Sequence, residues 1–165
     1  MDKEKYYIHT GFIYKQPAAG NPKRRVKSLA RKSRKEINLL TSQLYEIMES
    51  FSTQPDVYPQ ECDQATKCIH ALKTISTRLY GALENWDYIP EDTIPKRYPT
   101  LLYLSNLHEN ADELLPLICE FRDLCLEPSR HTSRLQNRIA SNLGELLENI
   151  NYFQQESKSL LLVMK

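Results

Sequence analysis

The chain has 165 residues, of which 41% are hydrophobic, and its 22 lysines and arginines nearly balance its 21 aspartates and glutamates. This length predicts one domain with a core of ordinary size, and the balanced charge excludes a molecule that attracts polyanions over its whole surface. Only four glycines are present. Because an all-β fold of many short strands needs more turn residues than this, the composition favours helices.

Residues 1–21 are expected to form an N-terminal tail, whose pattern is too short for a secondary-structure prediction. The tail ends in a turn signal in which Asn21 can cap a helix and Pro22 fits the first helical position. At the other end of the chain, residues 160–164 are apolar on every side of a helix, so the tail or a neighbouring subunit is expected to cover them. The aromatic residues of the tail and the apolar C-terminal residues are predicted to bind a partner: Tyr6, Tyr7, Phe12, Tyr14, Leu161, Leu162 and Val163.

Four stretches place apolar or small residues at alternating steps of three and four, which is the spacing of one stripe along a helix. They predict helices at about 22–52, 59–86, 99–126 and 133–163, and residues 22–165 therefore form the folded unit. The other three stripes continue with the same spacing as the first, which consists of Val26, Ala30, Ser33, Ile37, Leu40, Leu44, Ile47 and Phe51.

Prolines and polar residues set the predicted boundaries. Residues 87–99 contain three prolines and are expected to form a connecting loop without helix, because each proline removes a backbone donor and restricts its predecessor. Pro116 lies inside the third predicted helix and should kink it. Ser133 and Gln136 have the spacing of a capping box and predict the start of the fourth helix.

The predicted fold class is all-α, as an antiparallel up-down-up-down four-helix bundle with long helices and a short N-terminal tail. Helices of about 40 Å, at about 1.5 Å per residue, are joined by connections too short to run back along them. Each helix should therefore reverse the direction of the one before it. The same spacing also suits two long hairpins that associate only as a dimer.

The strongest local feature is the basic segment, residues 23–35, which contains eight cations and precedes the first acid, Glu36. The cations fall outside the apolar stripe and form a ridge on roughly 16 Å of helix, long enough to reach several phosphates. Cations at a helix N-terminus oppose the helix dipole and repel one another, so helix stability does not explain them. Anion binding would explain why the cations are there. The alternative is that the first turns of the helix are solvated and frayed. The predicted nucleic-acid-binding residues are Lys23, Arg24, Arg25, Lys27, Arg31, Lys32, Arg34, Lys35, Lys96 and Arg97.

The last two of these residues are included because the up-down topology brings the loop after the second helix to the same end as the basic segment. Tyr88 and Tyr98 would lie there too, where tyrosines beside cations can stack on bases. Alternatively, they cover the end of the bundle with their hydroxyl groups in water. Three further arginines form a separate, weaker patch at the opposite end: Arg130, Arg134 and Arg138.

No set of residues has the spacing of a catalytic, metal or cofactor site. The cysteines at 62 and 68, and those at 119 and 125, are six residues apart, which places the sulfurs of each pair about 120° apart on a helix. All four are expected to be small buried hydrophobes, and no secretory segment precedes them, so a cytoplasmic location is expected. Only His108 has an adjacent carboxylate in sequence, and neighbours on a helix do not face each other. No apolar run approaches the roughly 20 residues that span a membrane.

The resulting hypothesis is a non-catalytic helical-bundle subunit of a larger complex, without metal or cofactor, that binds nucleic acid by backbone contacts that are not sequence-specific. The alternative is a protein-interaction or oligomerisation adaptor without a nucleic-acid role. In that case the basic segment would contact an acidic protein surface, and the tail and C-terminal residues would join copies of the chain or bind another subunit. No membrane partner is expected.

Overall fold

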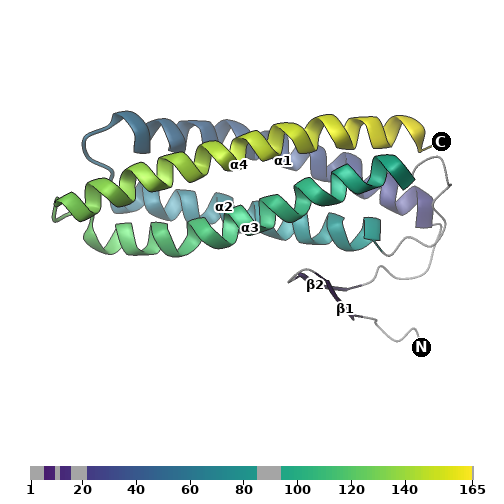
Figure 1. Cartoon of the computed structure of the whole chain (residues 1–165), viewed down its shortest axis with the longest axis horizontal. Coiled ribbons are helices and arrows are strands. Elements are labelled where there is room, and N and C mark those ends of the chain that lie inside the picture. The colour runs from purple at the N-terminus through teal and green to yellow at the C-terminus, as the bar shows by residue number, and fades with distance from the viewer. Residues whose placement is uncertain (1–5, 10–11, 16–21, 85–93, 165) are drawn as a thin grey trace.

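The computed structural model describes residues 6–9, 12–15, 22–84 and 94–164. Four helices form an elongated bundle, and two short strands precede them (Figure 1). The elements are β1 (Tyr6–His9), β2 (Phe12–Lys15), α1 (Pro22–Thr53), α2 (Pro59–Glu84), α3 (Ile94–Leu124) and α4 (Arg130–Val163).

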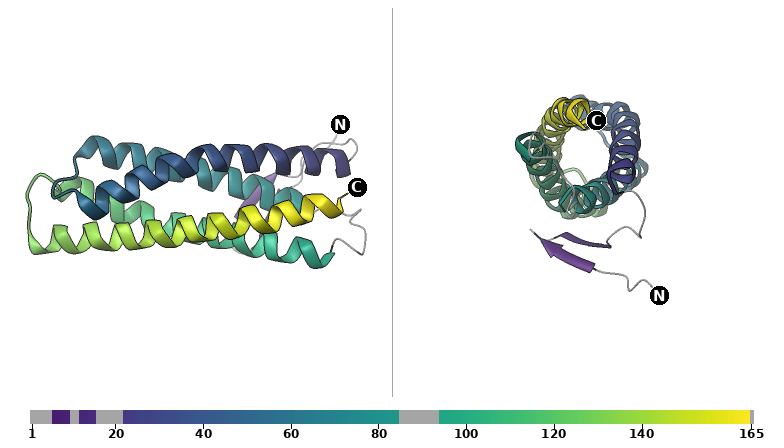
Figure 2. Two further views of the ribbon diagram at one scale, coloured as in Figure 1. Left: turned by 90° about the horizontal axis from the view of Figure 1, so that it is seen from above. Right: turned by 90° about the vertical axis from the view of Figure 1, so that its right-hand side faces the viewer.

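The four helices pack around one shared core, so that each helix contacts two others: α1 and α3 both lie against α2 and α4 (Figure 2). This confirms the predicted all-helical bundle of four helices. Side-chain contacts also show which parts of the helices meet. Gln136, early in α4, donates to the carbonyls of Phe51 and Gln54 at the end of α1, at 3.1 and 2.8 Å. Arg122, late in α3, donates through Nε to Asp63 Oδ1, early in α2, at 2.6 Å.

The predicted apolar stripes form the core. In α1 every stripe position is buried except Leu40, which is half-buried. In the other stripes the predicted residues that the structure describes are also buried, apart from the half-buried Cys125, which directly follows the end of α3. Phe51 and Phe121 meet edge to face across the core, with their ring centroids 5.4 Å apart. The three-and-four spacing therefore identified the buried surfaces correctly.

The predicted start of the third helix is wrong, because α3 begins at Ile94 and includes residues 94–99 of the expected loop. Pro95 lies in the first turn, where backbone N–H groups have no partner within the helix, so its missing donor has little effect there. Pro99 lies one turn further and removes one helical hydrogen bond, which the helix tolerates. Residues 87–93 of the expected loop lie outside the described residues, as does Trp86 at the predicted end of the second helix.

The predicted capping box at the start of the fourth helix is also wrong. The N-cap is Ser129, whose hydroxyl accepts from the Thr132 N–H at 3.2 Å while the Thr132 hydroxyl accepts from the Ser129 N–H at 2.7 Å. A threonine thus takes the place of the usual Glu or Gln. Gln136 instead binds the carbonyl groups at the end of α1, so Ser133 has no partner in the predicted box.

Replacing Ser129 with alanine is expected to lower the free energy of unfolding by about 1 kcal/mol, the usual contribution of an N-cap hydroxyl. Ser133→Ala is the matched control, because Ser133 is exposed inside α4, and it should change stability by less than about 0.5 kcal/mol. Urea denaturation followed by circular dichroism measures both. If Ser133→Ala lowered the stability more than Ser129→Ala, the helix would instead begin at Ser133.

The N-terminal tail contains an antiparallel hairpin that was not predicted from the sequence. Tyr7 pairs with Tyr14 and His9 with Phe12, and β2 contacts α2. The end view of Figure 2 places the hairpin on the opposite side of the bundle from the C-terminus. The hairpin therefore does not cover residues 160–164, which was the expected role of the tail.

The C-terminal run is only partly covered. Leu160 and Met164 are buried in the bundle, whereas Leu162 is 71% exposed. Leu161 and Val163 are half-buried. The bundle thus buries two of the five residues, and one large apolar side chain, Leu162, faces outward.

Candidate functional site

The basic segment forms the first part of α1, and most of its side chains lie at the surface. The first turn of this helix contains no acidic residue. Lys27 and Arg34 are half-buried, and the side chain of Lys23 lies outside the described part of the structure. The exposed members of the segment are Arg24, Arg25, Arg31, Lys32 and Lys35.

One exposed cation of the segment pairs with a carboxylate of its own helix. Lys32 Nζ lies 3.8 Å from Glu36 Oε1, one turn along the same helix, and exposed pairs of this kind contribute only a few tenths of a kcal/mol. Arg24 and Arg25 each have an interaction within the molecule. Arg31 and Lys35 form no ion pair with any described residue. These two exposed cations therefore remain available at the surface of the bundle.

Arg34 differs from its neighbours because it links α1 to α4. Its Nε–H donates to the hydroxyl of Ser157 at 2.9 Å, and its Nη2 group donates to the carbonyl of Gln154 at 3.2 Å. The side-chain amide of Gln154 returns a hydrogen bond to the carbonyl of Arg34 at 3.1 Å. Burial lowers the pKa of Arg34, but a guanidinium remains protonated at neutral pH. This cation is therefore held in place by neutral groups.

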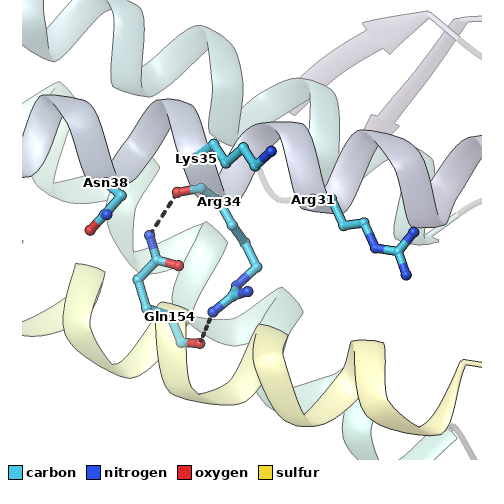
Figure 3. Close-up of a pocket in the computed structure, with 5 residues that line it drawn as sticks. All are labelled: Arg31, Arg34, Lys35, Asn38 and Gln154. Carbon is cyan, nitrogen blue, oxygen red and sulfur yellow. Dashed lines mark hydrogen bonds between the residues drawn. The ribbon is translucent and has the colours of Figure 1, made fainter.

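A pocket of about 360 Å³ lies beside this contact, between α1 and α4 (Figure 3). The pocket contains three cations and two amides but no carboxylate, so its electrostatic potential favours an anion. Sequence reasoning missed it, because Gln154 is 120 positions from Arg34 and no local pattern relates them. The lining residues are Arg31, Arg34, Lys35, Asn38 and Gln154.

The second part of the predicted nucleic-acid surface lies at the start of α3. Figure 1 places the starts of α1 and α3 at the same end of the bundle. Arg97 is half-buried, and its Nη1 group donates to the carbonyl of Leu83 at the end of α2, at 3.4 Å, so part of its role is to cap that helix. Tyr98 is 72% exposed. The side chain of Lys96 and all of Tyr88 lie outside the described residues.

The cysteines are free thiols, and they differ in exposure. Cys62 and Cys68 are buried as predicted, and burial raises the pKa of the Cys62 thiol to about 12. Cys119 is exposed, contrary to prediction, because the buried stripe of α3 passes through Ile118 and Phe121 on either side of it. Within the described residues, no three His, Cys, Asp or Glu side chains are grouped in a way that could hold a metal ion.

A buried histidine with a carboxylate partner was also missed. His108 Nδ1 lies 3.4 Å from Asp112 Oδ2, and Asp112 Oδ1 lies 2.5 Å from Lys73 Nζ on α2. Glu109 is adjacent to His108 in sequence but does not face it, whereas residues four apart on a helix share a face, so the spacing of His108 and Asp112 indicates the pair. Desolvation lowers the pKa of His108, and the attraction of Asp112 offsets this only in part.

The lowered pKa predicts a loss of stability in mild acid. The folded state binds the His108 proton more weakly than the unfolded state, so the free energy of unfolding should fall as the pH drops below the unfolded pKa of about 6.5. In His108→Gln this decrease should be smaller between about pH 8 and pH 5.5. His70→Gln, at an exposed position on α2, should keep the wild-type dependence. Urea denaturation at a series of pH values measures all three proteins, and equal profiles would contradict the prediction.

The fold and the site together define a four-helix bundle with a cationic first helix and an anion-compatible pocket at its side. No protein family matches the sequence, no curated protein matches it, and no solved structure matches the fold. No helix in the described part of the chain is long and apolar enough to cross a membrane. The functional argument therefore depends on the surface of the bundle.

Proposed function

We propose that the protein is a non-catalytic subunit of a larger assembly that binds nucleic acid through the basic segment of α1. The single observation that carries this proposal is the row of exposed cations at the start of a long helix: Arg24, Arg25, Arg31, Lys32 and Lys35. Such a row neutralises phosphates and releases their counterions, a favourable contribution that does not depend on base sequence.

The residue types favour contacts to the backbone of the nucleic acid. Residues 23–35 contain no aromatic side chain on which a base could stack and no asparagine or glutamine that could read a base edge. Arginine and lysine remain, and both bind phosphate oxygens. The proposal therefore implies similar affinity for unrelated sequences.

The proposal takes the bundle as antiparallel and up-down-up-down. In support, Arg34 of α1 contacts Gln154 late in α4, and Gln136 early in α4 contacts Phe51 at the end of α1. Arg122 late in α3 likewise contacts Asp63 early in α2. This arrangement adds Arg97 and Lys96 to the cationic end. The free thiols suit the reducing cytoplasm, where the protein is proposed to act.

Fluorescence anisotropy with two labelled single strands of unrelated sequence, each of about 16 nucleotides, tests the proposal. Both strands should bind with similar affinity, and binding should weaken at least about tenfold between about 50 and 200 mM salt. Absence of binding at low salt would reject the proposed function. A large preference for one sequence would reject its backbone-only form.

A protein-interaction or oligomerisation adaptor is the second candidate, and the exposure of Leu162 at the end of α4 favours it. The partner would be a second copy of the chain or another subunit, bound at the C-terminal residues. The proposed site also includes the tail residues Tyr6, Tyr7, Phe12 and Tyr14, whose side chains lie outside the described part of the structure. Size-exclusion chromatography with light scattering should then detect an oligomer that becomes smaller after deletion of residues 161–165. An unchanged mass with intact nucleic-acid binding would reject this candidate.

A further inference from the structure

We infer that the pocket lined by Arg31, Arg34 and Lys35 binds a terminal phosphate monoester, as found at the end of a nucleic-acid strand. This inference rests on the proposed function and deepens it, because it assigns one group of the ligand to one place on the basic segment. The pocket lies between α1 and α4, whereas the other exposed cations of the segment, Arg24, Arg25 and Lys32, do not line it.

Arg34 is the central residue of this site. Figure 3 shows its side chain crossing from α1 to the backbone of α4 beside Gln154, with Arg31 to one side and Asn38 to the other. Its hydrogen bonds to Ser157 and Gln154 use Nε and Nη2, and its Nη1 group donates to no described residue. The fixed guanidinium therefore holds donors in place before a ligand arrives, which reduces the entropy lost on binding.

The charge of the pocket suits a dianion. Both acceptors of Arg34 are neutral, so its full positive charge remains, and Arg31 and Lys35 add two exposed cations that can close on a ligand. The amides of Asn38 and Gln154 lie at the same pocket and can donate without adding negative charge. A phosphate monoester carries close to two negative charges at neutral pH and has three free oxygens for such donors.

Charge distinguishes a strand end from an internal phosphate. An internal phosphodiester carries one negative charge, whereas a terminal phosphate monoester carries close to two. The three cations at the pocket therefore favour the terminal group. The volume of about 360 Å³ lies at the lower end of the roughly 300–1,000 Å³ range of small-ligand pockets, enough for the phosphate and part of the adjoining nucleoside.

The test compares one internally labelled single strand of about 10 nucleotides carrying a phosphate at its 5′ end, at its 3′ end or at neither end. Anisotropy should show about tenfold tighter binding of at least one phosphorylated strand, the effect expected of a charge-assisted contact. Inorganic phosphate should abolish that preference, since it carries the same group. A strand whose terminal phosphate is capped as a methyl ester carries one charge fewer than the free phosphate, so it should bind more weakly than the free phosphate and only slightly more tightly than the hydroxyl form.

The double variant Arg31→Gln, Lys35→Gln should lose the preference for the terminal phosphate. The matched control Lys27→Gln, Lys32→Gln changes two cations outside the pocket, so it should weaken the binding of all strands equally and keep the preference. If the wild-type protein binds the 5′-phosphorylated, the 3′-phosphorylated and the unphosphorylated strand equally, this inference is overturned and the proposed function stands. Failure of every strand to bind would overturn the proposed function, and the inference with it. A preference that survives in the pocket variant would place the phosphate elsewhere.

Discussion

Replacing Leu44 with alanine is expected to lower the free energy of unfolding by about 2–5 kcal/mol. The Leu44 side chain is fully buried on the inner side of α1, where the four helices share one core. Removing its branched end loses apolar burial and leaves a cavity that rigid helices close only in part. Since a domain of this size has a stability of about 5–15 kcal/mol, the loss is a large fraction of the total.

Leu39→Ala is the matched control, because the same substitution is made on the same helix at a side chain that is 73% exposed. It should change stability by less than about 0.5 kcal/mol. Urea denaturation followed by circular dichroism measures both variants against the wild type. A similar loss in the two variants would contradict the assignment of the buried and exposed sides of α1.

Reversing three charges of the basic segment, Arg24→Glu, Arg31→Glu and Lys32→Glu, is expected to weaken nucleic-acid binding about a hundredfold at about 150 mM salt. Loss of three phosphate contacts removes roughly three counterions from the binding equilibrium, which corresponds to a factor of this size. The effect should be the same for unrelated sequences, because the lost contacts are to phosphates. The three side chains are exposed, so the helix should still form.

The matched control reverses Arg130, Arg134 and Arg138, which are exposed on the first turns of α4. Both variants lower the formal net charge by the same six units, from +1 to −5, so an effect of overall charge would appear in both. Binding by the control should remain within about threefold of the wild type. Equal losses would show that total charge, rather than the basic segment, determines affinity.

The helices and their buried sides could be predicted because they depend on local periodicity. Ile37, Leu44 and Phe51 are each seven residues apart, and a repeat of that length can only be buried on one side of a helix. Helix starts were less predictable, since several residues can serve as a cap. Ser129 and Ser133 have the same chemistry, but the capping box forms between Ser129 and Thr132, while Gln136 donates to the carbonyl of Phe51 at the end of α1.

The hairpin was missed because its strands have only four residues each. The only local signal is the enrichment of both segments in aromatic and β-branched residues on either side of Gly11. The cationic residues of the candidate site could be predicted from their density in the sequence. Their grouping around a pocket could not, because it depends on the packing of Arg34 against Gln154 on a helix distant in sequence.

The central claim is that the basic segment of α1 contacts the phosphates of a nucleic acid. The most direct test is the salt dependence of the binding constant, measured for the wild type and for the variant reversed at Arg24, Arg31 and Lys32. The slope of log K against log salt should be steep for the wild type and shallower in the variant by about 2–3. That result would assign the phosphate contacts to the outward cations of α1. Identical slopes for the two proteins would mean that this helix contributes no phosphate contacts, and the proposed role of the basic segment would be wrong.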